Sequence, residues 1–261
     1  MHDVLDLTRF PLDAPDSPCW NDLVASSRAT LLHDGLVNLP GFAQPEAAAT
    51  AARVLAPKLA AEGFTHARRH NIYFRREIPG LDPSHPALTQ FDTSNRTLCT
   101  DQLHRTLPER LYLWPPFARF LAAVMEKPAL HPMDDSLAGV NVMGYGDGQA
   151  LNWHFDRSEF TTTLLLQAPE AGGTFEYARD LRSDTDPNYD GVAALLDGHT
   201  TATRMPLAPG TLNIFKGRNT AHRVTPVKGN RPRIIAVFSY FAEPGVGFSD
   251  EERIGFYGRA G

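Results

Sequence analysis

Helical spacing of apolar residues marks the first half of the chain. Pro45 can open a helix that continues through the alanine-rich residues 46–62. Pro57 lies inside this stretch, so the helix is expected to kink or break there. A second helix is expected from about Pro116, because apolar residues then recur at helical spacing, at Phe117, Phe120, Leu121 and Val124. Residues 1–135 are therefore predicted to be rich in helix.

Short apolar runs separated by turn residues replace this spacing from about residue 136. The runs predicted to form strands are 137–145, 150–156, 160–167, 174–177, 200–207, 211–215, 222–227 and 233–241. Glycine-containing turns lie between several of them. Many short strands with regular turns are typical of a sandwich, barrel or jelly roll. We therefore expect a single domain over residues 1–261, in which the helix-rich residues 1–135 pack on a mainly β core of residues 136–261.

A polar segment at residues 180–198, which contains five aspartates, interrupts the predicted strands. Long insertions in a β core usually form surface loops, lids or disordered segments. We expect a solvated loop here. The composition does not distinguish a lid from a disordered loop.

Composition narrows the functional class. Of 261 residues, 42% are hydrophobic and 21% are charged, as in ordinary globular chains. No apolar run is long enough to span a membrane, and the first residues lack the basic and apolar regions of a secretory signal. The net charge of −5 and the lack of a Lys/Arg block argue against nucleic acid or an anionic membrane as a partner. Two distant cysteines, Cys19 and Cys99, favour a reducing, cytoplasmic location. Nothing in the sequence indicates an oligomeric state.

The candidate chemistry begins at His154-Phe155-Asp156, which is followed by His222 after 68 residues. Alternate residues of a strand point to the same face, so His154 and Asp156 can reach one metal ion while Phe155 points away. A histidine from a facing strand completes a set of two imidazoles and one carboxylate. This set is the ligand triad of non-haem Fe(II) oxygenases, and it leaves positions open for a cosubstrate and O2. We therefore expect His154, Asp156 and His222 to be the metal ligands and the catalytic residues.

An arginine is expected beside this triad. The run that starts at His222 predicts a strand, a tight turn and a second strand that begins at Arg233. Bidentate binding of a carboxylate needs a fixed guanidinium, and a strand position holds one better than the turn position of Arg231. Tyr145 and Asn141 share a strand face that leads toward the triad. Either could hydrogen-bond a cosubstrate, or both could pair only with backbone or water.

These motifs resemble the Fe(II)/2-oxoglutarate-dependent dioxygenases. The family pattern HxD…H…R is present as His154, Asp156, His222 and Arg233, and the resemblance spans residues 137–241. It implies a double-stranded β-helix core (a cupin-like jelly roll), and Fe(II), 2-oxoglutarate and O2 as cofactor and cosubstrates. It also implies that Arg233 binds the C5 carboxylate of 2-oxoglutarate. The implied reaction decarboxylates 2-oxoglutarate to succinate and CO2 and hydroxylates an unactivated C–H bond.

A narrower resemblance concerns the substrate. The runs 153–156, 163–177 and 256–259 resemble a bacterial group that acts on free amino acids and includes lysine-type hydroxylases and radical halogenases. The halogenases of this group carry glycine in place of the metal-binding carboxylate. Because this chain keeps Asp156, the resemblance implies hydroxylation of a small polar substrate, an amino acid or a derivative of one.

Substrate contacts are less clearly marked. Trp153 and Arg157 flank the triad and Glu159 follows, so the charged pair could hold a zwitterion or could simply be exposed. Arg75 could reach a substrate carboxylate from the N-terminal part. Two alternatives stay open: a non-catalytic metal-binding jelly roll that acts as a sensor or ligand-binding module, and a hydroxylase of peptide or protein side chains. Arg233 argues against the first, because a pure metal binder needs no carboxylate-binding fork.

Overall fold

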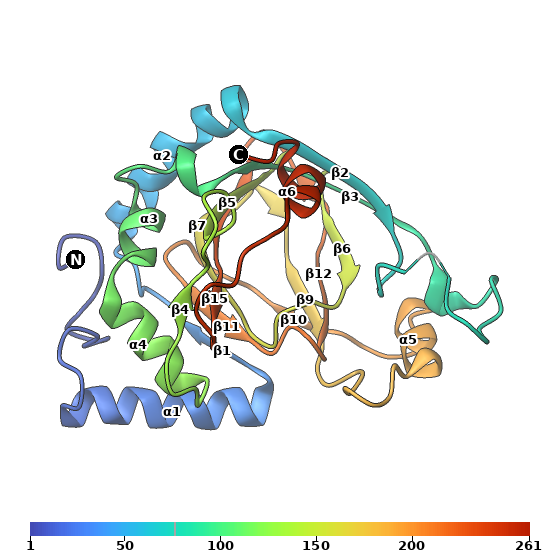
Figure 1. The fold of residues 1–261 in the computed structure, drawn as a ribbon, viewed down its shortest axis with the longest axis horizontal. Coiled ribbons are helices and arrows are strands. Elements are labelled where there is room, and N and C mark those ends of the chain that lie inside the picture. Colours follow the sequence, from blue (N-terminus) through green and yellow to red (C-terminus); the bar gives the residue numbers. More distant parts are fainter. Residues whose placement is uncertain (76) are drawn as a thin grey trace.

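The structure, a computed structural model, describes residues 1–75 and 77–261 and has two antiparallel β-sheets at its centre (Figure 1). The larger sheet has seven strands in the order β1 (Leu36–Leu39), β11 (Leu212–Phe215), β7 (Thr161–Gln167), β14 (Arg233–Phe238), β5 (Val140–Tyr145), β3 (Phe91–Leu98) and β2 (Phe64–His70). The smaller sheet has four strands in the order β10 (Thr203–Met205), β9 (Phe175–Ala178), β12 (Ala221–Val224) and β6 (Leu151–His154).

The main strands between residues 140 and 238 are divided between the two sheets. Successive strands cross from one sheet to the other, except for β9 and β10, which are neighbours in the smaller sheet. This is the arrangement of a double-stranded β-helix, or jelly roll. Two short strand pairs complete it, namely β8 (Ala171–Gly172) with β13 (Val227–Lys228) and β4 (His131–Pro132) with β15 (Tyr240–Phe241). The predicted fold class, mainly β with helices near the N-terminus, is confirmed.

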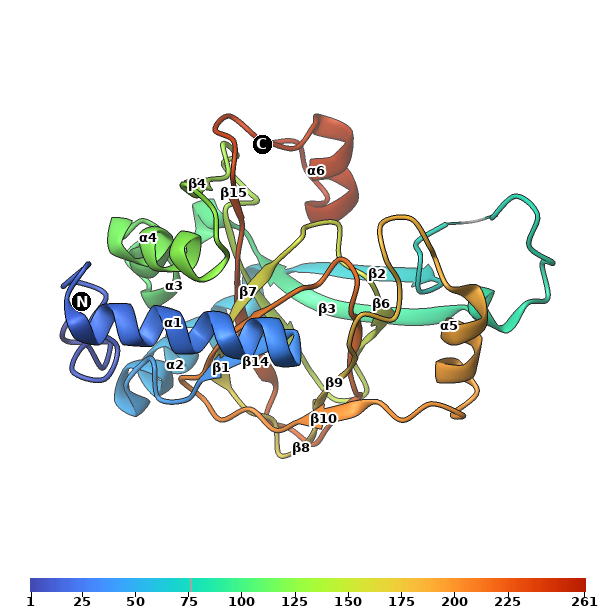
Figure 2. The same cartoon turned by 90° about the horizontal axis from the view of Figure 1, so that it is seen from below.

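Helices lie around this core. They are α1 (Pro18–Asp34), α2 (Pro45–Glu62), α3 (Leu107–Tyr112), α4 (Pro115–Val124), α5 (Tyr189–Leu196) and α6 (Asp250–Tyr257), with short 3-10 helices η1 (Pro86–Leu88) and η2 (Thr100–Gln102). Helices α1 to α4 lie together, whereas α5 lies at the far end of the molecule (Figures 1 and 2). Among the described residues, no helix combines the length and apolar character needed to cross a lipid bilayer.

The predicted break at Pro57 does not occur, because α2 runs as one helix from Pro45 to Glu62. A proline removes one helical hydrogen bond, here the one that the Arg53 carbonyl would accept. Both Pro57 and Arg53 are exposed, so water can bond to that carbonyl. The opposite face of α2 is buried and anchors the helix through Leu55 and Leu59.

The N-terminal part contributes more strand than the sequence predicts. β1 extends the larger sheet at one edge, and β3 and β2 extend it at the other. β2 carries polar or exposed side chains on both faces, among them Thr65, His66 and Arg68. It therefore lacks the apolar alternation that identifies a strand in a sequence. The expected change from helices to strands near residue 135 is therefore not sharp, because strands occur on both sides of it. The single domain over residues 1–261 stays a prediction.

The predicted solvated loop at residues 180–198 is wrong in its second half, where α5 forms. The Asn188 side chain caps this helix by accepting a hydrogen bond from the Gly191 N–H. Val192 and Leu195 lie one turn apart and are buried in an apolar cluster that includes Phe155. Tertiary contact with the core thus stabilises a helix that the aspartates obscure in the sequence. The predicted strand at 200–207 is shorter, since β10 spans only Thr203–Met205.

Phe117 joins the helical layer to the larger sheet. Its side chain is fully buried in α4, and its ring lies 5.2 Å from the ring of Phe238 in β14. The ring of Phe42 lies 6.0 Å away on another side. Because β14 begins at Arg233, this packing supports the strand that carries a candidate site residue.

Phe117→Ala is expected to lower the free energy of unfolding by about 3–5 kcal/mol, because it removes a buried aromatic ring and leaves a cavity. Urea unfolding followed by circular dichroism measures this change. Leu113→Ala alters a side chain that is 62% exposed and should change the free energy by less than about 0.5 kcal/mol. Equal effects in the two variants would contradict the packing described for Phe117.

Candidate metal centre

The predicted triad comes together between β6 and β12 in the smaller sheet. His154 ends β6 and lies directly opposite His222 in the strand register. The Asp156 carboxylate lies 3.3 Å from Nε2 of His154 and 3.5 Å from Nε2 of His222. One ligand atom from each of the three residues lies within 4.8 Å of the others, and both histidines are buried. The arrangement is compact enough for one metal ion to contact all three side chains.

Hydrogen bonds set the tautomer of both imidazoles. Nδ1 of His154 lies 2.8 Å from the Asn152 carbonyl oxygen, and Nδ1 of His222 lies 3.0 Å from the Thr220 carbonyl oxygen. A carbonyl oxygen only accepts hydrogen bonds, so each Nδ1 carries a proton and donates it. In the neutral ring, Nε2 then presents its lone pair toward Asp156. This is the orientation that a metal-ligating histidine needs, so the donor set fits a divalent transition metal.

Asp156 is also held in place. The Thr161 hydroxyl donates to the carboxylate at 2.5 Å, and the Asp156 N–H donates to the Gly217 carbonyl at 3.0 Å. Gly217 is packed so closely that a Cβ at this position would overlap the Asp156 carboxylate. A residue without a side chain is therefore required next to this carboxylate.

The surroundings of the triad favour the ionised form of the Asp156 carboxylate, which lies between the two imidazoles. Burial opposes ionisation of Asp156, but the two nearby imidazoles outweigh it and hold the pKa of this carboxyl well below its usual range. Burial and repulsion from His222 lower the pKa of His154. Burial also acts to lower the pKa of His222, but the nearby Asp156 outweighs it and raises that pKa. A divalent cation held by these three side chains would compensate the buried carboxylate charge.

Arg233 lies inside the jelly roll. It starts β14 opposite Tyr145 of β5, and the two side chains are 3% and 1% exposed. The guanidinium carbon lies 5.9 Å from the Tyr145 ring centroid, and burial lowers the pKa of Arg233 to about 10. Within the described chain, no carboxylate lies within ion-pair distance of this guanidinium. Arg231, by contrast, is exposed and donates to the Pro169 carbonyl.

Asn141 is buried but engaged with other parts of the fold. Its amide N–H donates to the Leu137 carbonyl at 2.7 Å, and its side-chain oxygen accepts from the Tyr257 hydroxyl at 2.9 Å. These bonds tie β5 to α6 and engage one N–H and the oxygen of the Asn141 side chain. A contact between Asn141 and a cosubstrate stays a prediction.

Three of the four predicted substrate contacts lie away from the triad. Trp153 alternates with His154, faces the opposite side of β6 and packs under Arg223 at 4.8 Å. Glu159 forms an ion pair with Lys127 at 2.7 Å. Arg75 is exposed and lines a separate cleft described below. Trp153 and Glu159 were predicted from their closeness to the triad in the sequence, and Arg75 from the basic residues of the N-terminal part; their contact with a substrate stays a prediction.

Arg157 follows the triad carboxylate and is 74% exposed at its side chain. It forms an ion pair of 2.8 Å with Glu252, and its guanidinium carbon lies 5.8 Å from the ring centroid of Phe256. The carboxylate of Glu252 in α6 thus compensates the charge of Arg157.

Aromatic residues beside the triad were missed at the sequence level. The Phe74 ring lies 5.9 Å from the His154 ring, and the Phe215 and Phe175 rings lie 4.8 and 5.8 Å from the His222 ring. Phe175 and Phe215 occupy inward positions of the predicted strands, so their alternation was an available signal. Phe74 has φ of 55° in a loop, and its position depends on tertiary contacts.

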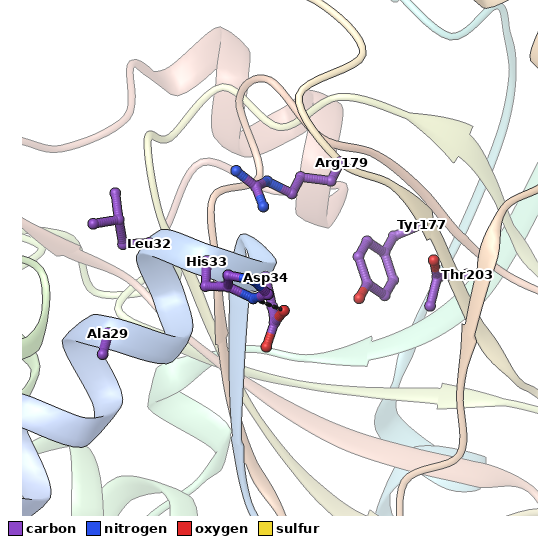
Figure 3. A pocket seen from close by; sticks show the side chains of 7 residues that line it. All are labelled: Ala29, Leu32, His33, Asp34, Tyr177, Arg179 and Thr203. Carbon is purple, nitrogen blue, oxygen red and sulfur yellow. Dashed lines mark hydrogen bonds and ion pairs between the residues drawn. The ribbon is translucent and has the colours of Figure 1, made fainter.

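A groove of about 710 Å³ lies elsewhere, between the end of α1 and the β9–β10 edge (Figure 3). Its lining includes Leu32, Tyr177 and Arg179, together with an ion pair of 2.6 Å between His33 and Asp34. The triad residues do not line it. The candidate chemistry is therefore separate from this groove.

Solved structures share the fold. The chain is similar to a 2OG-Fe(II) oxygenase from Burkholderia pseudomallei, with 18% identity over 85% of this chain and 92% of that one and a TM-score of 0.50. It is similar to SnoN, a non-haem α-ketoglutarate-dependent epimerase from nogalamycin biosynthesis, with 14% identity over 85% and 81% and a TM-score of 0.56. A prolyl-4-hydroxylase from Pseudomonas putida has 12% identity over 83% and 98% and a TM-score of 0.51. At these identities the likeness establishes the fold of 2-oxoglutarate–Fe(II) oxygenases.

No curated protein sequence matches the chain. A family model does: Halogenase D matches residues 93–248, which is more than half of the chain. The matched region contains His154, Asp156, His222 and Arg233. The chain belongs to the Halogenase D family.

Proposed function

We propose that the protein is an Fe(II)/2-oxoglutarate-dependent oxygenase that hydroxylates an unactivated C–H bond of a small polar substrate, an amino acid or a derivative of one. The observation that carries this proposal is the buried guanidinium of Arg233, which pairs with no carboxylate of the described residues and lies in the same jelly roll as a triad of two imidazoles and one carboxylate. A metal site alone would not explain the arginine.

Arg233 fits the far carboxylate of a dicarboxylate cosubstrate. Burying a cation without a counter-charge costs several kcal/mol, and an anionic ligand removes that cost. The planar guanidinium of arginine binds carboxylates through two parallel hydrogen bonds. The Tyr145 ring packs beside it and limits its orientation. We therefore assign the C5 carboxylate of 2-oxoglutarate to Arg233.

His154, Asp156 and His222 would hold Fe(II). When bound, this ion with 2-oxoglutarate and O2 supplies the oxidation: 2-oxoglutarate loses CO2 to give succinate, and a C–H bond gains oxygen. The chain's own contribution is orientation and exclusion of water. Two backbone carbonyls fix the imidazoles, and the Thr161 hydroxyl and the Gly217 carbonyl hold Asp156. Phe175 and Phe215 cover the inner side of His222.

Hydroxylation is favoured over halogenation by Asp156. In the amino-acid group that the chain resembles, halogenases carry glycine at the corresponding position, which frees a position for a halide. Here the carboxylate is present and accepts a hydrogen bond from the Thr161 hydroxyl, while the Asp156 backbone N–H donates to the Gly217 carbonyl. The resemblance to that group also supports an amino acid as the substrate.

The decisive experiment is anaerobic titration of the Fe(II)-loaded protein with 2-oxoglutarate. We expect a charge-transfer band to appear and, in air, succinate to form when a suitable free amino acid is added. Succinate release across a panel of free amino acids identifies the substrate. If neither the charge-transfer band nor succinate appears, the proposal is overturned and a non-catalytic metal binder is favoured. If only peptides stimulate succinate formation, the proposed substrate class is contradicted.

Arg233→Gln should raise the 2-oxoglutarate concentration needed for half-maximal succinate formation at least tenfold, because a charge-assisted hydrogen bond contributes about 1.5–3 kcal/mol. Arg231→Gln removes the same charge from an exposed side chain and should leave that concentration nearly unchanged. Thermal unfolding checks that both variants are folded. The opposite ranking of the two variants would assign the carboxylate to Arg231.

Gly217→Ala should weaken binding of Mn(II), a redox-stable substitute for Fe(II), at least tenfold, because the new methyl group displaces the Asp156 carboxylate. Isothermal titration measures the affinity. Gly255→Ala is the matched control, since nothing lies within 4 Å of a Cβ built there. Unchanged Mn(II) affinity in Gly217→Ala would argue against Asp156 as a ligand.

A further inference from the structure

A second polar cleft, of about 270 Å³, lies between three segments at the α5 end of the molecule. These segments are the loop after β2, the insertion after β9 and the turn before β12. They contribute the side chains Tyr73, Arg75, Arg182, Asp184, Arg218 and Asn219. Figures 1 and 2 both show α5 and the loop after β2 next to each other. The volume is close to the lower end of the roughly 300–1,000 Å³ that is usual for small-molecule sites, so it suits a small group.

Three arginines, one from each segment, converge on this cleft. In the described part of the chain, none of Arg75, Arg182 and Arg218 lies within ion-pair distance of a carboxylate. Asp184 is the single acid among the described lining residues, and it accepts a long hydrogen bond from the Asn219 amide at 3.5 Å. The lining therefore carries three positive charges and one negative charge.

Arg182 is held in a fixed position. Its guanidinium carbon lies 4.0 Å from the ring centroid of Phe155, and its Nε donates to the Arg218 carbonyl at 2.8 Å. The Tyr73 hydroxyl donates to the Pro187 carbonyl at 2.7 Å and ties two of the segments together. Burial lowers the pKa of Arg182, and repulsion from Arg75 and Arg218 adds to this. Like charges held this close destabilise the fold unless an anion lies between them.

An unpaired acceptor adds to the polar character of the site. The side-chain oxygen of Asn219 is buried and has no hydrogen-bond partner among the described residues. A buried acceptor without a donor costs free energy, so a hydroxyl of a ligand is a natural partner.

We propose that this cleft binds the phosphate group of a phosphorylated small molecule. The lining has a surplus of two positive charges, which matches the charge of a phosphate monoester better than that of a single carboxylate. Guanidinium groups bind phosphate oxygens through paired hydrogen bonds, and three of them can surround a tetrahedral anion.

The site is distinct from the candidate metal centre. Phe155 lies between His154 and Asp156 in the chain, but strand alternation turns its side chain away from the triad and under Arg182. Ligands at the triad and at the arginine cleft would therefore occupy opposite faces of the chain at this point. Binding in the cleft does not depend on the proposed oxygenase activity.

The probe is inorganic pyrophosphate, and isothermal titration measures its binding to the chain. A chelator first removes any metal ion, so that pyrophosphate cannot bind to a metal at the triad. We expect one binding site per chain, and weaker binding by at least tenfold in Arg218→Gln and Arg75→Gln, both exposed side chains whose loss should not unfold the protein. Arg69→Gln removes an exposed arginine of β2 outside the cleft and should leave the affinity unchanged.

Asp184→Asn tests the sign of the effect. Removing the negative charge should tighten pyrophosphate binding severalfold, an outcome that a merely structural role of Asp184 would not give. The proposal is overturned if wild-type protein does not bind millimolar pyrophosphate, if Arg69→Gln weakens binding as much as Arg218→Gln, or if Asp184→Asn weakens it. Acetate that binds as tightly as inorganic phosphate would overturn the assignment to phosphate.

Discussion

The antiparallel pairing of β6 with β12 is the contact on which the candidate metal centre depends. In this register His154 lies opposite His222, and strand alternation turns both imidazoles inward. A slip of one residue would turn one of them to the outer face. The register shifts between His222 and Val224, where an irregularity interrupts the ladder. Such bulges often re-aim side chains next to active sites.

The rest of the fold protects this pairing and provides its inner wall. The larger sheet faces β6 and β12 across the interior and places Arg233 and Tyr145 there. Helices on its outer face bury a continuous apolar cluster, which supports the sheet from behind. The N-terminal strands widen the same sheet, and the loop that follows β2 brings Phe74 to the edge of His154. The loop after β2, from the N-terminal part of the chain, thus lies beside a metal centre whose ligands come from the C-terminal part.

The sequence predicted the features that depend on local geometry. Strand alternation placed His154 and Asp156 on one face, and a strand position rather than a turn position favoured Arg233 over Arg231. The spacing of turns indicated a sandwich, barrel or jelly roll, and the family resemblance implied the double-stranded β-helix. The features that it did not predict depend on contacts between distant segments. α5 forms because Val192 and Leu195 reach an apolar cluster, and β2 exists because β3 supplies its hydrogen bonds. Trp153 faces outward because adjacent residues of a strand point to opposite sides, so its closeness to His154 in the sequence does not bring its side chain to the triad.

A buried guanidinium without a protein carboxylate links folding to metabolite supply. A ligand that binds only the folded chain stabilises it by about 2.7 kcal/mol at a hundred times its dissociation constant. If Arg233 binds 2-oxoglutarate, the lifetime of this protein in a cell depends on the concentration of a central carbon metabolite. The residue that recognises the cosubstrate would then also couple the stability of the folded chain to the supply of that cosubstrate.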